Sequence, residues 1–263
     1  MTDLTIRDRF VPTTGIHNFR DYGGWTTREG GRVKTGLLYR SGHHVGATDE
    51  DLRQFAEAGI QTVIDLRGNS ERDAHPCRRV DGWDGEVIFY DGETASSPPH
   101  MDIDETTTTV EYARDRMMQL YTRMPRNPAM IEMFRRYFRI LDERDGASLV
   151  HCFAGKDRTG VAATLLLHVL GVNEDDQVAE FVLTNAAPTF DVLKRQSAPG
   201  IEERLGRPLD DDALEALLGV HEDYIHRWFE TAREEAGSLD GYIETKLGVD
   251  DAMRERLKAR FLA

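Results

Sequence analysis

Residues 151–160, HCFAGKDRTG, decide how the rest of this chain is interpreted. A short, largely apolar run, 148–150, precedes them, and the apolar stretch 161–170 follows them. This order predicts a short buried strand, a tight loop and then a helix. A loop that enters a helix directs several free backbone N–H groups toward one spot, with the positive end of the helix dipole behind them. The segment is therefore expected to hold an anion such as a phosphate group.

Cys152 and Arg158 are the reactive side chains of this loop. A cysteine at the mouth of such a nest has a stabilised thiolate and is expected to react at neutral pH. Arg158 curls back and offers a planar fork that fits two oxygens of a phosphate. A cysteine in hydrophobic surroundings is usually a small core residue. The His, Arg, Thr and glycine residues at their required offsets argue against this for Cys152. A nucleotide P-loop is excluded because position 150 is valine.

The order His-Cys, five residues, Arg and then Thr resembles the signature of the protein tyrosine phosphatase superfamily. Two further blocks are similar to its bacterial branch, which includes secreted mycobacterial and listerial tyrosine and lipid phosphatases. They are NFRDYGG at 18–24 and the strand end Asp65-Leu-Arg67, so the resemblance spans most of residues 16–170. Rhodanese-like sulfurtransferases usually lack the flanking His and the Arg-Thr-Gly ending. Arsenate reductases need more cysteines than the two in this chain.

The resemblance implies that a phosphoester is hydrolysed in two displacements through a covalent phosphocysteine. Cys152 is then the nucleophile, and Arg158 and the loop N–H groups hold the phosphoryl oxygens. His151 is expected behind the cysteine, where it orders the loop. Thr159 is expected to donate its hydroxyl to the leaving sulfur and to contribute as a helix cap. The mechanism requires no metal or other cofactor. The remaining loop residues are candidate substrate-binding groups, namely Phe153, Ala154, Gly155 and Lys156.

A general acid must protonate the leaving group, and two carboxylic acids are candidates. In many phosphatases this acid lies on a Trp-Pro-Asp loop, but here Trp83 is followed directly by Asp84. Asp157 lies in the active loop, and Asp65 ends the strand predicted at 63–66. The bacterial branch usually has its acid at the position of Asp157, so the resemblance favours Asp157. Asp65 would then orient the substrate, share the proton or cap a turn.

Three basic residues bear on the substrate class. Lys156 resembles the loop lysine of phosphoinositide phosphatases, which adds positive charge for polyanionic rings, or it pairs with a carboxylate. Arg20 and Arg67 belong to the matched motifs and are candidate substrate-binding residues at the pocket rim. The alternative for both arginines is a buried ion-pair network that ties the N-terminus to the sheet. The histidines outside the loop have no metal-ligand spacing.

The composition restricts the class of protein. A length of 263 residues, with 40% hydrophobic and 30% charged residues, is ordinary for a globular protein with a substantial core. The formal net charge of −14 argues against general affinity for nucleic acid or anionic membranes. Two cysteines exclude a disulfide framework. Residues 1–9 lack the apolar core of a signal peptide, and no run reaches transmembrane length. A cytoplasmic protein is expected, with signal-independent export as the alternative.

Periodicity and turn residues predict an α/β fold in a single domain, residues 1–263. A central, mostly parallel sheet of about four or five strands is flanked by helices, and the active loop follows the carboxyl end of one strand. Residues 94–109 are expected to form a loop, and Pro199 and Pro208 to break the chain between helices. The expected strands span 33–39, with a turn inside or beside it, 62–67, 86–90 and the run before the active loop. The expected helices span 48–59, 110–124, 128–141, 161–170, 174–185, 210–219, 220–237 and 239–261, the last interrupted near Gly248.

The predicted function is phosphomonoester hydrolysis by a cysteine-dependent phosphatase with protein-tyrosine or dual specificity. A phosphoinositide, or a small metabolite such as a nucleotide, is the alternative substrate, and the acidic surface disfavours the lipid. A non-catalytic phosphate-binding module is a third hypothesis, but such proteins typically lose the Cys or the Arg. The extra C-terminal helices include a candidate lid, residues 188–220, for which a plain packed subdomain is the alternative. The oligomeric state is not predicted.

Cys77 raises a separate redox hypothesis. A thiolate of low pKa is readily oxidised, and some relatives protect the nucleophile through a disulfide with a nearby cysteine. Cys77 lies ten residues after Arg67 and is a candidate partner for Cys152. Spacing alone does not fix the geometry that a disulfide demands, so an ordinary residue near the turn at Pro76 is favoured.

Overall fold

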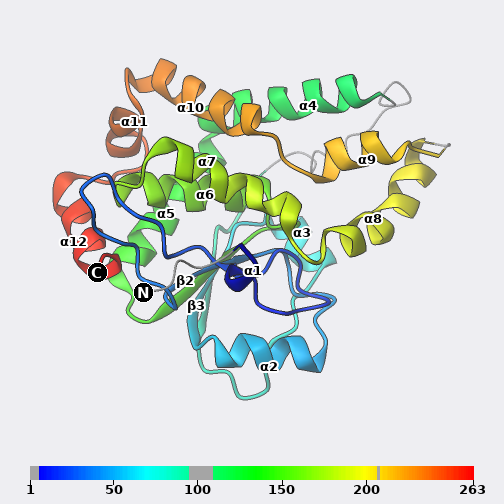
Figure 1. Ribbon diagram of the computed structural model, residues 1–263, viewed down its shortest axis with the longest axis horizontal. Helices are drawn as coiled ribbons and strands as arrows, with labels where there is room; N and C mark the ends of the chain where they lie inside the picture. The colour runs from blue at the N-terminus through cyan, green and yellow to red at the C-terminus, as the bar shows by residue number, and fades with distance from the viewer. Residues whose placement is uncertain (1–5, 95–108, 206–207) are drawn as a thin grey trace.

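The computed structural model describes residues 6–94, 109–205 and 208–263, and its centre is a five-stranded sheet (Figure 1). The strands are ordered β1-β2-β5-β3-β4 across the sheet. β1 pairs antiparallel with β2, and the other neighbours pair in parallel. The predicted mostly parallel sheet is therefore confirmed. The strands are β1 (Arg20–Asp21), β2 (Leu38–Ser41), β3 (Ile60–Asp65), β4 (Glu86–Phe89) and β5 (Ala147–His151).

Helices cover both faces of the sheet, which confirms the predicted α/β class. In Figure 1, α2 lies on one side, and α5, α6 and α7 lie on the other, with α4 and α10 farther out. No described helix is both long enough and apolar enough to span a bilayer. The helices are α1 (Ile6–Arg9), α2 (Asp49–Glu57), α3 (Asn69–Ala74), α4 (Val110–Arg123), α5 (Pro128–Glu143), α6 (Asp157–Val169), α7 (Glu174–Val182), α8 (Phe190–Leu205), α9 (Asp211–Leu218), α10 (Glu222–Ala236), α11 (Leu239–Thr245) and α12 (Asp251–Phe261), with 3-10 turns η1 (Met124–Arg126) and η2 (Leu183–Ala186).

The central strands alternate their side chains between two hydrophobic clusters. In β3, Val63 belongs to the cluster that contains Phe55 of α2, and Ile64 belongs to the cluster that contains side chains of α5 and α6. Leu149 and Val150 of β5 divide in the same way. Successive residues of a strand face opposite sides of the sheet. β5 is therefore packed on both faces, and the loop that follows it starts from a fixed point.

The predicted start and stop of α2 are confirmed. The Thr48 hydroxyl accepts a hydrogen bond from the Asp51 N–H at 3.1 Å, and the Asp51 carboxylate accepts one from the Thr48 N–H at 2.9 Å. Gly59 follows the helix with a φ of 64°, in the left-handed region that favours glycine. Near the C-terminus, the predicted interruption at Gly248 separates α11 from α12.

Of the strand predicted over 33–39 with a turn inside or beside it, the turn is confirmed, but the strand starts later than expected. β2 begins at Leu38, and Val33 makes an isolated bridge to Leu262. Gly36, with a φ of 78°, turns the chain between the two. The apolar pattern of this stretch reflects burial against two different partners rather than one continuous strand.

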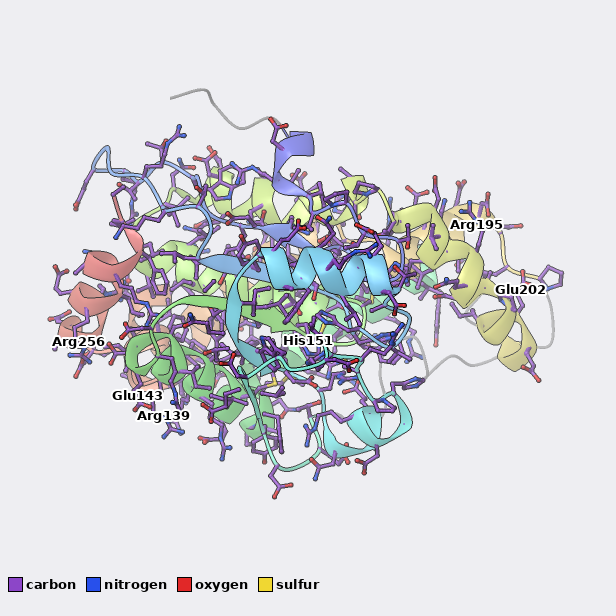
Figure 2. The ribbon with its side chains drawn as sticks, turned by 90° about the horizontal axis from the view of Figure 1, so that it is seen from below. Arg139, Glu143, His151, Arg195, Glu202 and Arg256 are labelled. Carbon is purple, nitrogen blue, oxygen red and sulfur yellow. The ribbon has the colours of Figure 1, made fainter. Side chains whose placement is uncertain are left out.

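Pro199 does not break the chain, contrary to expectation, but lies inside α8. A proline in a helix removes one N–H and leaves the carbonyl four residues earlier without its partner. That residue is Arg195, which is exposed and points outward from α8, as does Glu202 (Figure 2). Water can therefore satisfy the carbonyl, and the helix continues. The loop predicted over 94–109 falls almost entirely outside the described residues.

α8 and α9 form a pair at one edge of the molecule, drawn in yellow in Figure 1. They have a small apolar cluster of their own, built around Ile201, Leu214 and Leu218. α9 also packs against α4. This pair occupies most of residues 188–220, the segment that the sequence singles out as a candidate lid.

Candidate active site

The active loop leaves β5 after His151 and enters α6 at Asp157. Gly155, within it, has a φ of 71°, and a Cβ at this position would lie 2.4 Å from the backbone of Ser41. Glycine is therefore required both for backbone conformation and for space. Arg40 Nη2 and Asn18 Nδ2 each donate to the Gly155 carbonyl at 2.8 Å. The loop is thus held by β2 and by the segment that precedes β1.

The backbone N–H groups from Ala154 to Thr159 have no acceptor in the described part of the chain. Lys156 is the N-cap of α6, and its side chain does not cap the helix. Free donors at the start of a helix, with the dipole behind them, form an anion-binding site. The loop therefore has the free N–H groups that its sequence leads one to expect.

Cys152 and His151 lie buried at the start of this loop, Cys152 with only 2% of its surface exposed. His151 Nδ1 donates to the Cys152 carbonyl at 3.2 Å. Burial lowers the pKa of His151 to about 4, although the nearby Asp65 carboxylate opposes the shift. The imidazole is therefore neutral near pH 7. It stacks on His44 with ring centroids 5.4 Å apart, so both contacts fix the geometry around the cysteine.

Thr159 is fully buried, and its hydroxyl has no hydrogen-bond partner among the described residues. Its expected contribution as a helix cap is wrong, because Lys156 occupies the N-cap position and Thr159 lies within the first turn. A buried hydroxyl without a partner is costly unless a ligand or a reaction intermediate uses it. The Thr159 hydroxyl is therefore available to a ligand or an intermediate in the loop.

Arg158 is clamped by Glu71 of α3, which the sequence did not single out. Nη1 and Nη2 of Arg158 donate to the two Glu71 oxygens at 2.5 and 2.7 Å. Nη1 also donates to the Leu66 carbonyl and to Thr94 Oγ1, each at 3.1 Å. Burial opposes the charge of Arg158, but Glu71 and the charge of Cys152 raise its pKa above the ordinary value.

The other edge of this guanidinium stays open. Nε of Arg158, and the second hydrogen of Nη2, have no acceptor among the described residues. A guanidinium has five N–H donors in a fixed fork, so this edge can bind two phosphate oxygens while Glu71 holds the other. The clue to Glu71 in the sequence is its place three residues after Gly68, whose N–H donates to the Glu71 carboxylate at 3.1 Å as α3 begins.

Asp157, the first candidate acid, is held through one oxygen only. Tyr121 of α4 donates its hydroxyl hydrogen to Asp157 Oδ1 at 2.8 Å. The Lys156 ammonium lies 3.6 Å from the same oxygen. Oδ2 makes no hydrogen bond with the described residues. Asp157 is part-exposed, with 15% of its side-chain surface open to solvent.

Asp65, the second candidate acid, is fully engaged by Arg67. Nε and Nη2 of Arg67 donate to Oδ1 and Oδ2 of Asp65 at 2.9 and 2.7 Å. Burial raises the pKa of Asp65, but His151 and Arg67 outweigh it and lower that pKa to about 2. Both side chains are 2% exposed. Arg67 thus lies in a buried ion pair, the second of its two interpretations, rather than at an open rim.

Lys156 points toward α9. Its ammonium is buried and donates to the carbonyls of Leu217 and Gly219 at 2.6 and 3.2 Å. The C-terminal end of a helix carries partial negative charge and favours a cation. The expected carboxylate partner, Asp157 Oδ1, lies 3.6 Å away, so the hydrogen bonds of Lys156 go to backbone carbonyls instead.

Arg20 is fully buried behind the loop. Its Nε and Nη2 bond to Glu180 of α7, and Arg40 Nη1 donates to the same carboxylate at 3.0 Å. Burial, together with the charge of Arg40, lowers the pKa of Arg20 to about 9. Arg40 in turn donates to Gly155, so the network supports the loop. The buried-network interpretation therefore describes Arg20, and Glu180 is a partner that sequence reasoning missed.

Cys77 lies beside Arg67 rather than in a disulfide. Its Sγ accepts hydrogen bonds from Arg67 Nη2 and from the His44 N–H, each at 3.2 Å. The hypothesis of a Cys77–Cys152 disulfide on oxidation stays a prediction. Within the described residues, no group of three or more His, Cys, Asp and Glu side chains could hold a metal ion.

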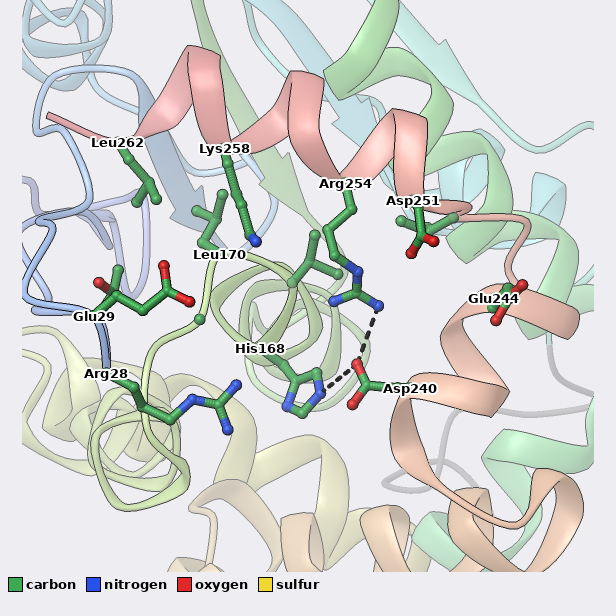
Figure 3. Close-up of a pocket in the computed structure, with 14 residues that line it drawn as sticks. Arg28, Glu29, His168, Leu170, Asp240, Glu244, Asp251, Arg254, Lys258 and Leu262 are labelled. Carbon is green, nitrogen blue, oxygen red and sulfur yellow. Dashed lines mark hydrogen bonds and ion pairs between the residues drawn. The ribbon is translucent and has the colours of Figure 1, made fainter.

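Two hollows are lined by described residues. One, of about 320 Å³, is at the far end of α6, where Arg28, His168 and Lys258 line it together with Asp240 and Arg254 (Figure 3). The other, of about 330 Å³, lies between α4, α9 and α10. Cys152, Asp157 and Arg158 line neither of these two hollows.

Comparison with known proteins agrees with the loop. Residues 11–263 match the Tyrosine phosphatase family. A putative tyrosine-protein phosphatase of Cupriavidus necator is 30% identical over 94% of this chain and 86% of its own. The triple specificity protein phosphatase PtpB of Mycobacterium tuberculosis is 27% identical over 94% of this chain and 97% of its own. A tyrosine-protein phosphatase of Nostoc commune is 28% identical over 81% and 70%. The resemblance that the active loop indicates is confirmed, and the chain belongs to the tyrosine phosphatase family.

Proposed function

We propose that this phosphatase hydrolyses phosphomonoesters with Cys152 as its nucleophile and Arg158 as its phosphate clamp. The observation that carries the proposal is the row of N–H groups from Ala154 to Thr159 that find no acceptor among the described residues, in the loop that follows the buried Cys152. Three equatorial phosphoryl oxygens need several donors, and these groups together with the open edge of Arg158 supply them.

The reaction then runs in two displacements. The Cys152 thiolate attacks phosphorus, the bond from phosphorus to the leaving oxygen breaks, and Asp157 gives its proton to that oxygen. Water next attacks phosphorus and returns a proton to Asp157, while the sulfur–phosphorus bond breaks and the thiolate is restored. The Thr159 hydroxyl, which has no other partner, donates to the departing sulfur.

Asp157 suits the role of acid better than Asp65. A general acid must carry a proton and must reach the leaving group. Asp65, with a pKa of about 2 and both oxygens bound to Arg67, is ionised near neutral pH. Asp157 keeps one oxygen free. We therefore assign Asp65, with Arg67, to the support of His151 and the loop.

The substrate class that we propose is a phosphorylated protein, with tyrosine or dual specificity. The relatives are named tyrosine phosphatases, and one is named for triple specificity. A phosphoinositide is the alternative, but the positive charge that it would use, Lys156, is bound to α9. A formal charge of −14 also opposes an anionic membrane. A nucleotide-sized substrate is the other alternative, and binding of phosphate without catalysis is disfavoured because both Cys152 and Arg158 are present.

We propose further that α8 and α9 act as a lid within a single phosphatase domain. Their own apolar cluster, around Ile201, sets them apart from the two main clusters. They attach to the active loop through Lys156 and to the N-terminal segment through the bond from the Asn18 N–H to Thr189 Oγ1 at 3.2 Å.

With only two cysteines, the chain suits a reducing compartment, which supports a cytoplasmic location.

A phosphate-release screen over phosphotyrosine and phosphoserine peptides, phosphoinositides in vesicles and nucleotides tests the substrate class. We expect the phosphotyrosine peptides to give the highest kcat/KM. Cys152→Ser is the control for each substrate, and should remove turnover while vanadate still binds. Preference for a phosphoinositide or a nucleotide would overturn the protein assignment, and turnover by Cys152→Ser would overturn the mechanism.

A further inference from the structure

Tyr121 reaches the candidate acid from a helix far away in the sequence. Ala113, Met117 and Tyr121 form the buried face of α4. The spacing of four residues places all three on one side of the helix. From there the Tyr121 hydroxyl meets Asp157 Oδ1 at 2.8 Å, which is the length of a strong hydrogen bond to a carboxylate.

The ring of Tyr121 is locked by its neighbours. It is fully buried, and it packs edge-on against Phe181 of α7 with ring centroids 6.0 Å apart. On its other side lies Tyr224 of α10, with centroids 5.5 Å apart. Burial, and then the charges of Asp157 and Cys152, raise the pKa of Tyr121 well above its ordinary value, so the hydroxyl keeps its proton and acts as a donor.

We propose that Tyr121 is a positioning residue, which fixes Asp157 so that Oδ2 carries the proton to the leaving group. The two oxygens of a free carboxylic acid exchange roles by rotation about χ2. Because the Tyr121 hydroxyl donates to Oδ1, the acidic proton of Asp157 is disfavoured on that oxygen, where it would compete with the phenol hydrogen. The acidic hydrogen is thereby directed to Oδ2, the oxygen without a partner. This inference rests on the assignment of Asp157 as the general acid.

Lys156 does not replace this contact. Its ammonium lies 3.6 Å from Oδ1, beyond normal hydrogen-bond length, and it already donates to two carbonyls at the end of α9. Arg158 contributes charge to the site, but its hydrogen bonds go to Glu71, Leu66 and Thr94. Among the described residues, Tyr121 is therefore the side chain that orients Asp157 through a direct hydrogen bond.

The test compares Tyr121→Phe with Tyr224→Phe. Each variant loses one phenol oxygen from the same stacked pair, but the Tyr224 hydroxyl makes no hydrogen bond with a described residue. With phenyl phosphate, whose leaving group needs a proton, we expect kcat of Tyr121→Phe to fall about tenfold, a part of the full effect of general acid catalysis. With para-nitrophenyl phosphate, kcat should change less than about twofold, and KM should stay constant for both substrates. Tyr224→Phe should match the unmodified protein on both.

The double variant separates a positioning role from a structural one. If Tyr121 acts through Asp157, adding Tyr121→Phe to Asp157→Asn should lower kcat no further. An equal loss on both substrates, an undiminished loss in the Asp157→Asn background, or no loss at all would overturn the inference. The assignment of Asp157 as the acid fails on different evidence, namely an Asp157→Asn variant without any dependence on the leaving group, and the proposed function fails if Cys152→Ser still turns over substrate.

Discussion

The two ends of α6 show how one helix serves two purposes. At its start, the N–H groups from Ala154 to Thr159 find no acceptor among the described residues and lie in the loop that follows Cys152. At its end, the backbone closes on itself, since the Gly171 and Val172 N–H groups donate to the carbonyls of His168 and Leu167 at 3.0 Å. Unsatisfied donors at a helix start are costly unless a ligand uses them. This difference supports the proposal that the chemistry takes place at the start of α6, whereas the end has its backbone donors satisfied.

Charged side chains differ between the ends in the same way. At the end of α6, Asp240 Oδ1 lies 3.2 Å from His168 Nε2 and 3.0 Å from Arg254 Nη2, and 65% of the Asp240 side chain is exposed (Figure 3). At the start, the ion pair of Arg158 and Glu71 is about one-tenth exposed. Solvent screens the first group and hardly screens the second. Substitutions at the two ends should therefore differ in what they change and by how much.

Among the substitutions that keep Cys152, the largest expected effect is that of Asp157→Asn at the start of α6. If Asp157 protonates the leaving group, kcat with phenyl phosphate should fall by about a hundredfold to ten-thousandfold. The loss with para-nitrophenyl phosphate should be far smaller, because that leaving group needs little help. Steady-state kinetics with both substrates measures the difference. Asp65→Asn is the matched variant, and a dependence on the leaving group in Asp65→Asn alone would reverse the assignment.

Glu71→Gln tests the clamp on Arg158. The amide keeps the shape and one oxygen acceptor but loses the charge and one of the two bonds at 2.5 and 2.7 Å. The bidentate pair with Glu71 fixes the orientation of the Arg158 guanidinium. We therefore expect kcat/KM to fall about tenfold for both aryl phosphates, and vanadate to bind more weakly. Asp73→Asn, an exposed change on the same helix, should leave both unaltered. Equal behaviour of the two variants would rule out a clamping role.

Lys156→Met sharpens the account of α8 and α9. The variant keeps the apolar stem but removes the donor to the Leu217 and Gly219 carbonyls. We expect amide hydrogen exchange in α8 and α9 to become about tenfold faster, because the loss of a charged hydrogen bond lowers the free energy of local opening. Lys194→Met, which removes a contact of 3.4 Å with Glu215 on the same pair of helices, serves as control. Unchanged amide exchange in Lys156→Met would show that the Lys156 side chain does not hold the proposed lid, α8 and α9, in place.

The smallest effect is expected at the far end of α6. Asp240→Asn removes an exposed ion pair, so the free energy of unfolding should drop by about 1 kcal/mol or less. kcat on either aryl phosphate should not change. Urea denaturation and steady-state kinetics measure the two quantities. A large loss of activity would mean that the two ends of the helix are coupled, and would break the comparison.

The site residues that could be predicted from the sequence are those that lie close together along the chain. Cys152, Asp157 and Arg158 share one loop, so their meeting follows from the strand-loop-helix order alone. Their partners could not be predicted, because Glu71 and Tyr121 come from α3 and α4, and only the tertiary fold brings them near. For the secondary structure too, local sequence signals predicted local features and not contacts between distant segments.

The predictions that were wrong or undecided have related causes. The capping box at Thr48 is local and was predicted, whereas Pro199 remains inside α8 because the exposed side of a helix lets water satisfy the free carbonyl. The position of β2 depends on which residues meet β5, a long-range pairing of Leu38 with Ser148 that periodicity does not reveal. The sequence left two roles open for Arg20 for the same reason, because its ion-pair partner, Glu180, lies 160 positions away along the chain.

The most direct test of the central claim is to trap the covalent intermediate. The protein is mixed with para-nitrophenyl phosphate, quenched in acid during turnover, and digested for mass spectrometry. The account predicts a phosphoryl group on the peptide that contains Cys152, absent from Cys152→Ser and from protein quenched before substrate is added. Steady turnover with no phosphorylated Cys152, or with the phosphoryl group on another residue, would contradict it.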